Sequence, residues 1–101
     1  MIKIVNGIKY NTETADQVAQ YFYSDEYNTD DYCLERLFRK TTGQYFLCCE
    51  GGRNTKYARI EGHYKTSGNV IISVDEAGAK KWAENRISVD QYENIFGIVE
   101  E

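Results

Sequence analysis

Apolar residues recur with two different periods along this chain, and each period predicts a different kind of element. The first ten residues are mostly β-formers, interrupted by Asn6-Gly7. This pair favours a two-residue hairpin turn because both of its positions need a positive φ. After a polar stretch that can cap a helix, apolar residues return at helical spacing: Ala15, Val18, Ala19 and Phe22. This spacing predicts a helix that ends near Tyr23.

The middle of the chain has the alternating pattern of strands. Between residues 33 and 40, alternate side chains would share a face, which puts Leu34, Arg36 and Phe38 on one side and Cys33, Glu35 and Leu37 on the other. Residues 44–50 are apolar on both faces, as in a central strand. A loop over 51–56, a weak strand over 57–64, a turn over 65–68 and a short buried strand over 69–72 are expected to follow.

Two helix starts are indicated near the C-terminus. Ser73 and Glu76 have the spacing of a capping box, and Ser88 and Gln91 repeat it. The first helix would present one apolar face, formed by Ala79, Trp82 and Ala83. The second would present Val89, Tyr92 and Phe96 and stop at Gly97.

These elements occur in the order β-β-α-β-β-β-β-α-α. Because hairpins outnumber crossovers, we expect an α+β fold with an antiparallel sheet of about five to six strands and helices packed on one face. A length of 101 residues predicts a single domain over 1–101. Trp82 and Phe22 are the expected contacts between the helices and the sheet.

The charges are segregated along the chain. The net charge of −4 divides into −5 over residues 1–35, +5 over 36–65 and −4 over 66–101. Such a division can steer a charged partner towards the protein. It can equally reflect neutralisation between neighbouring elements of the fold, which is the more common case.

No arrangement of residues points to catalysis. His63 is the only histidine and stands in no motif, so a surface position is expected for it. Cys33, Cys48 and Cys49 lack the spacing of a zinc site and are expected as reduced, packed thiols. We therefore expect a protein that is not an enzyme and that uses no metal and no cofactor.

Two surfaces are candidates for binding. The first is an acidic loop with a tyrosine, in which spaced carboxylates could imitate a phosphate backbone and occupy a basic groove; its residues are Asp25, Glu26, Tyr27, Asp30 and Asp31. The second is a basic set that could hold nucleic acid, although the chain as a whole is acidic; its residues are Arg36, Arg39, Lys40, Arg53 and Lys56. The segment 51–56 lacks the phosphate-loop pattern, and a strand rather than a helix is expected after it.

Several segments together resemble a group of small acidic proteins from phages and mobile elements of Gram-positive bacteria. They are Asn11–Ala15, Leu37–Leu47, Glu50–Gly52, Thr55–Ala58, Ala79–Ala83 and Tyr92–Gly97. Some small proteins of this kind are anti-CRISPR inhibitors. The resemblance implies a non-enzymatic inhibitor that binds a host protein, such as a CRISPR-associated nuclease or complex. Nucleic-acid binding through the basic set is the alternative.

The expected location is the cytoplasm of a bacterial host. No apolar run approaches the roughly 20 residues that a membrane span requires. The apolar start of the chain is interrupted at Asn6-Gly7, which is too early for a signal peptide.

Overall fold

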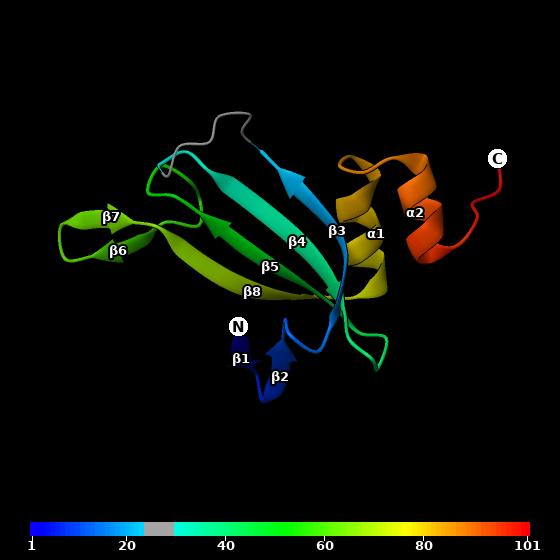
Figure 1. The fold of residues 1–101 in the computed structure, drawn as a ribbon, viewed down its shortest axis with the longest axis horizontal. Helices are drawn as coiled ribbons and strands as arrows, with labels where there is room; N and C mark the ends of the chain where they lie inside the picture. The colour runs from blue at the N-terminus through cyan, green and yellow to red at the C-terminus, as the bar shows by residue number, and fades with distance from the viewer. Residues whose placement is uncertain (24–29) are drawn as a thin grey trace.

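The computed structural model describes residues 1–23 and 30–101, which form eight strands and two helices (Figure 1). The strands are β1 (Ile2–Val5), β2 (Ile8–Asn11), β3 (Asp16–Phe22), β4 (Cys33–Arg39), β5 (Tyr45–Gly51), β6 (Arg59–Glu61), β7 (Tyr64–Thr66) and β8 (Gly68–Val74). The helices are α1 (Glu76–Glu84) and α2 (Val89–Phe96).

A four-stranded antiparallel sheet, in the order β3-β4-β5-β8, is the centre of the molecule. Two separate two-stranded ribbons, β1-β2 and β6-β7, accompany it. Figure 1 shows α1 and α2 together at one end of the sheet, with the β6-β7 ribbon projecting from the other. The predicted α+β class is therefore confirmed, although the main sheet has four strands and the other strands form ribbons.

The sheet separates two apolar cores. The helix-side core lies between the sheet and the helices and contains Ala19, Leu37, Tyr45, Leu47, Cys49, Ala79, Trp82 and Ala83. The hairpin-side core lies under the β1-β2 ribbon and contains Tyr10, Phe38, Phe46, Cys48 and Ile71. Alternate residues of β4 and β5 belong to opposite cores, because successive side chains of a strand point to opposite faces. Cys48 and Cys49 are therefore neighbours in sequence but lie in different cores, both as free thiols.

The structure confirms several predictions that were based on a few adjacent residues. Asn6 and Gly7 have φ values of 52° and 78°, as their hairpin turn requires. Ser88 and Gln91 form the complete capping box, and Gly97 ends α2. The apolar face predicted for α1 is also the face that it buries.

The predicted helix over 15–22 is wrong, because this segment is strand β3. It pairs with β4 along its whole length, and the register shifts between Gln17 and Ala19. This β-bulge allows the adjacent residues Val18 and Ala19 both to pack against the helix-side core. The bulge removes the regular alternation of a strand, and the remaining pattern resembles that of a helix. Phe22 is 37% exposed and does not join the helix-side core, contrary to expectation.

Two further predictions near β8 are wrong. The segment predicted as a turn over 65–68 belongs mostly to β7 and β8. Ser73 does not cap α1; it stays in β8, opposite Phe46, and Asp75 caps the helix instead by accepting a hydrogen bond of 2.7 Å from the Gly78 amide. The strand is also less buried than expected, because Ile71 is its only buried residue.

Trp82 provides a test of how the helices are attached to the sheet. It is 7% exposed, and it packs with Ala79 and Ala83 against the sheet. Trp82→Ala should lower the free energy of unfolding by about 3–5 kcal/mol, as large aromatic deletions in cores do. Because small domains have only about 5–15 kcal/mol in total, urea denaturation should show a large loss of stability.

Tyr64→Ala is the matched control, since Tyr64 is 78% exposed. It should change the stability by less than about 0.5 kcal/mol. An unchanged denaturation midpoint for Trp82→Ala would contradict the placement of α1.

Candidate functional site

A buried carboxylate, Glu35 of β4, is the most unusual polar group of the structure. It is 3% exposed and lies on the face of the sheet that the helices cover. Tyr23 donates a hydrogen bond of 2.7 Å to its Oε1, and the Trp82 indole N–H donates one of 2.8 Å to the same oxygen. Tyr57 donates a hydrogen bond to Oε2. One carboxylate therefore joins the end of β3, strand β4, the loop after β5 and helix α1.

Two cations complete this cluster. The Lys56 ammonium lies 3.3 Å from Oε2 of Glu35, and the Arg86 guanidinium lies 3.6 Å from Oε1. Arg86 also donates to the Tyr23 hydroxyl and to the backbone carbonyl of Trp82. The Arg86 side chain is mostly covered, whereas the Lys56 side chain is 60% exposed and reaches the carboxylate with its ammonium group.

The surroundings keep Glu35 ionised. Burial alone would raise its pKa, but the hydrogen bonds from Tyr57, Trp82 and Tyr23 and the charge of Lys56 outweigh it and lower the pKa to about 2. The pKa values of its neighbours Cys49 and Tyr57 are raised instead. Burial raises the pKa of the Cys49 thiol to about 11, and burial and the bond to Glu35 raise the pKa of Tyr57 above its ordinary value.

These shifts are unfavourable for chemistry near neutral pH. A general base is most useful with a pKa near the working pH, and a nucleophilic thiol needs a lowered pKa. Glu35 is too weak a base, and the Cys49 thiol stays protonated. The role that these properties fit best is structural: the cluster holds separate elements of the fold together.

The predicted acidic surface is only partly within the described residues. Asp25, Glu26 and Tyr27 lie outside them. Asp30 lies 3.1 Å from the Arg53 guanidinium, and Asp31 accepts a hydrogen bond of 2.8 Å from the Asn54 side chain. Two acids of the proposed decoy therefore contact the loop that follows β5, and one of them, Asp30, is paired there with a cation.

The predicted basic residues do not form one cationic face. Arg36 projects on the hairpin side, 3.8 Å from Glu50, and its buried Nε has no hydrogen-bond partner among the described residues. Lys40 donates a hydrogen bond of 2.9 Å to the Lys9 carbonyl, beside the Tyr10 ring.

The other basic positions are elsewhere. Arg39 lies at the end of β4, opposite Asp16. Arg53 pairs with Asp30, and Lys56 with Glu35 on the opposite side of the sheet from Arg36. His63 is exposed in the turn between β6 and β7, as expected for a surface histidine.

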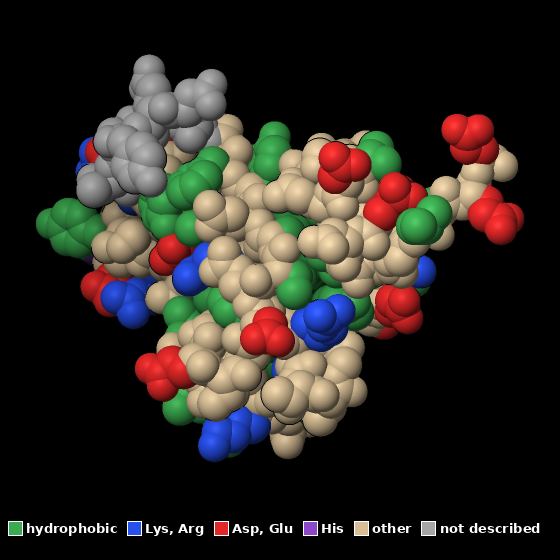
Figure 2. Space-filling view, turned by 45° about the vertical axis from the view of Figure 1, so that its right-hand side comes forward, with side chains coloured by type: hydrophobic (Ala, Val, Ile, Leu, Met, Phe, Trp, Pro, Cys, Tyr) green, Lys and Arg blue, Asp and Glu red, His purple; other side chains and the backbone are tan. Residues whose placement is uncertain are grey.

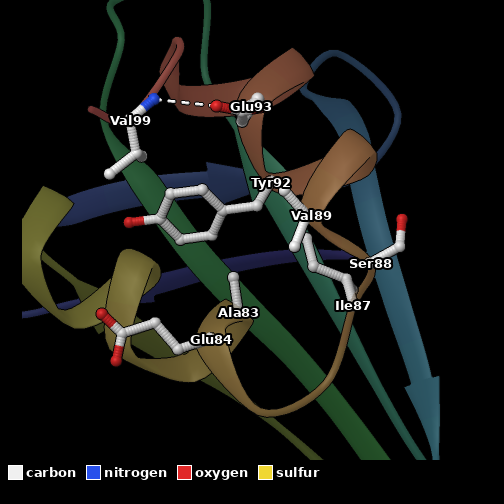
Figure 3. A pocket seen from close by; sticks show the side chains of 8 residues that line it. All are labelled: Ala83, Glu84, Ile87, Ser88, Val89, Tyr92, Glu93 and Val99. Carbon is white, nitrogen blue, oxygen red and sulfur yellow. Dashed lines mark hydrogen bonds between the residues drawn. The ribbon is translucent and has the colours of Figure 1, made fainter. Parts of the chain in front are cut away.

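An apolar cleft between α1, α2 and the C-terminal tail is a stronger candidate for a binding site (Figure 3). Its volume is about 350 Å³, and it is lined by Ala83, Glu84, Ile87, Ser88, Val89, Tyr92, Glu93 and Val99. The tail folds back over α2, because the Val99 amide donates a hydrogen bond of 2.8 Å to the Glu93 carboxylate. Figure 3 shows the Tyr92 ring extending across the hollow, between Ala83 and Val99.

Apolar side chains around this cleft are unusually exposed. Val89 is 73% exposed, Val99 59% and Ile98 88%. Grouped exposed apolar side chains with a polar rim are typical of protein-binding surfaces. The volume suits one or two large side chains of a partner.

Two acids, Glu84 and Glu93, line the cleft, and the segment around it is acidic. Residues 84–101 contain five acids, namely Glu84, Asp90, Glu93, Glu100 and Glu101, and a single base, Arg86. Since Arg86 is turned towards Glu35, it does not neutralise this rim. Figure 2 shows acidic side chains gathered towards the end of the molecule that carries the C-terminus. We call residues 84–101 with the cleft they enclose the C-terminal surface.

Sequence reasoning missed both the Glu35 cluster and the C-terminal surface. An acid that alternates with Cys33 and Leu37 on the apolar face of a strand was the available signal for the cluster. For the C-terminal surface, the signal was a set of apolar residues in a segment with several acids and a single base. Neither signal says which distant residues come together.

Comparison with protein-family models, with curated proteins and with solved structures found no match. Neither helix of the described residues is long and apolar enough to cross a membrane. Among the same residues, no group of three or more His, Cys, Asp or Glu side chains could hold a metal ion.

The Glu35 cluster predicts a specific dependence of stability on pH. The pKa of Glu35 is lowered from 4.5 to about 2 on folding, so its ionised form stabilises the fold above pH 4.5 and this stabilisation is lost as the pH falls towards 2. Glu35→Gln should lower the free energy of unfolding at neutral pH by roughly 1–3 kcal/mol, because it leaves buried donors without a charged acceptor. Urea denaturation at several pH values should show the difference from wild type shrinking as the solution becomes more acidic.

Glu61→Gln is the matched control, because Glu61 is 61% exposed and pairs with the exposed Arg59. Its difference from wild type should be small at every pH. A Glu35→Gln difference that stays constant down to pH 2 would contradict the assignment of the lowered pKa.

Proposed function

We propose that this chain is a non-enzymatic protein-binding inhibitor, carried by a phage or a mobile element, and that it occupies a host protein such as a CRISPR effector. The observation that supports the proposal best is the C-terminal surface, in which exposed apolar side chains surround a cleft with an acidic rim. The phage-protein resemblance of the sequence is the second support.

The chemistry of the C-terminal surface indicates the chemistry of its partner. An acidic rim is complementary to Lys and Arg residues, and the cleft can receive an apolar or aromatic anchor between them. Proteins that bind nucleic acid line the binding channel with Lys and Arg side chains. CRISPR effectors hold the heteroduplex of guide RNA and target DNA in a channel of this kind. Acidic groups placed in that channel would compete with the phosphate backbone.

The alternative, nucleic-acid binding through the basic set, has less support. Its cations are distributed over both sides of the sheet, and Arg53 and Lys56 are paired with acids. Phosphate binding gains affinity from cations that neutralise a continuous run of phosphates. A chain with a net charge of −4 would also be repelled at long range.

A plasmid-interference assay with individual Gram-positive CRISPR effectors tests the proposal. Co-expression of the chain should restore transformation of a targeted plasmid, and the purified effector should bind the chain in biolayer interferometry. Val89→Ser should remove an apolar contact and weaken this binding about tenfold or more. Glu84→Lys should slow association and reduce its dependence on salt, because rim charges act mainly on the association rate.

Ile60→Ser is the matched control. Ile60 is 71% exposed, close to the 73% of Val89, but it lies on β6 at the other end of the molecule. The three variants should melt like wild type, since exposed substitutions change stability by less than about 0.5 kcal/mol.

The outcomes separate the hypotheses. Failure to inhibit or bind any effector would overturn the CRISPR assignment. Binding that survives Val89→Ser and Glu84→Lys would exclude the C-terminal surface as the interface. Retention on a DNA column at moderate salt that is lost on replacing Arg36 and Arg39 by Ala would establish the nucleic-acid alternative.

A further inference from the structure

Strand β8 is an edge of the main sheet, and its contact with the β1-β2 ribbon is at its start, where Lys3 donates hydrogen bonds to the carbonyl (3.5 Å) and the side chain (3.1 Å) of Asn69. It pairs with β5 on one side and is the last strand of the sheet among the described residues. It has seven residues in continuous register, without a bulge, and none of them is charged. Asn69, Val70, Ile72 and Ser73 are exposed, so side chains on both faces of this strand are accessible.

The opposite edge is protected and provides a comparison. Strand β3 begins with Asp16, contains Gln17 and Gln20 among its exposed positions and is interrupted by the bulge after Gln17. Bulges and charged side chains prevent an edge strand from pairing with another chain. Between Gly68 and Val74, β8 has neither of these features.

The sequence of β8 is complementary to itself in an antiparallel arrangement. If Ile71 of one copy lies opposite Ile71 of another, Val70 lies opposite Ile72 and Asn69 opposite Ser73. Each of these cross-strand pairs matches apolar with apolar or polar with polar. Val70 and Ile72, which are 37% and 39% exposed, would be covered on the helix side of the sheet.

The charges at the two ends of β8 are also complementary in this arrangement. A hollow of about 670 Å³ lies beside the start of the strand, and three basic residues line it, namely Lys3, Lys56 and Arg59. Within one copy, Lys56 pairs with Glu35, Arg59 pairs with Glu61, and Lys3 donates to Asn69, so a second copy would add to these contacts or exchange with them. The end of the strand is followed by the acids Asp75, which caps α1, and Glu76, which lies 3.4 Å from the Lys80 ammonium at the surface. An antiparallel second copy brings its acidic end to the basic hollow of the first, and the two-fold symmetry repeats this contact.

We propose that the chain forms a symmetric dimer in which two β8 strands pair antiparallel, centred on Ile71, and join two four-stranded sheets into one sheet of eight strands. Main-chain hydrogen bonds supply the contact, and Val70 and Ile72 supply its apolar part. Because one strand pair covers less surface than a typical stable interface, the dimer should depend on concentration. This inference uses the sheet edge and is independent of the proposed function of the C-terminal surface.

Sedimentation velocity over a wide range of protein concentration tests the proposal. The wild-type chain should change from monomer to dimer as the concentration rises. Ile72→Lys puts an ammonium group opposite Val70 of the other copy, with the two new charges diagonal to each other across the two-fold axis, and it should raise the dissociation constant of the dimer about tenfold or more. Its circular dichroism spectrum and melting temperature should stay close to those of the wild type.

The controls identify the edge and the orientation. Gln20→Lys puts the same charge on the β3 edge and should leave the dimer unchanged. Lys3→Glu and Glu76→Lys should each weaken the dimer, and the double variant should restore it, because the two charges exchange places across the interface.

Three results would overturn the proposal. One is a wild-type chain that stays monomeric at every concentration, which would leave the β8 edge to a strand of another protein. Another is a dimer that Ile72→Lys does not weaken. The third is a double charge variant that is no better than the single ones.

Discussion

The ionised Glu35 side chain is the interaction on which the architecture depends. A carboxylate can be buried only if donors and cations replace the water it loses. Here those groups come from three separate parts of the chain: Tyr23 after β3, Lys56 and Tyr57 in the loop after β5, and Trp82 and Arg86 at the end of α1. The packing of α1, the course of the loop after β5 and the end of β3 are all fixed by one acid.

The Glu35 cluster also determines which charges remain available for partners. It pairs Lys56 and Arg86 with Glu35, while Arg53 pairs with Asp30. The basic middle of the sequence is thus largely used within the molecule. The acids of residues 84–101 keep no basic neighbour within their own segment, because Arg86 is directed inwards. The electrostatic field outside the protein is set by this difference between the paired cations and the acids of residues 84–101.

The sequence predicted what is decided locally and failed where distant residues compete. Asn6-Gly7 and Ser88 were informative because a positive φ or a capped amide is a property of a few adjacent residues. The segment containing Val18 and Ala19 was misread because its bulge exists only in pairing with β4. Ser73 lost its capping role because pairing with β5 keeps it in the strand. The partners of Glu35 and the fold-back of Val99 onto Glu93 depend on tertiary contacts that spacing does not encode.

The order of the strands has a consequence for how the chain folds. In the main sheet each strand pairs with the next along the chain, apart from the short β6-β7 ribbon between β5 and β8, so closing these pairs costs little loop entropy. The donors to Glu35 are 12, 22 and 47 residues away. We expect the sheet to assemble while Glu35 is still hydrated, and α1 to dock last. Docking without all the donors would bury an unsatisfied charge, so the final step should be cooperative, without a stable intermediate in which the helix is only half attached.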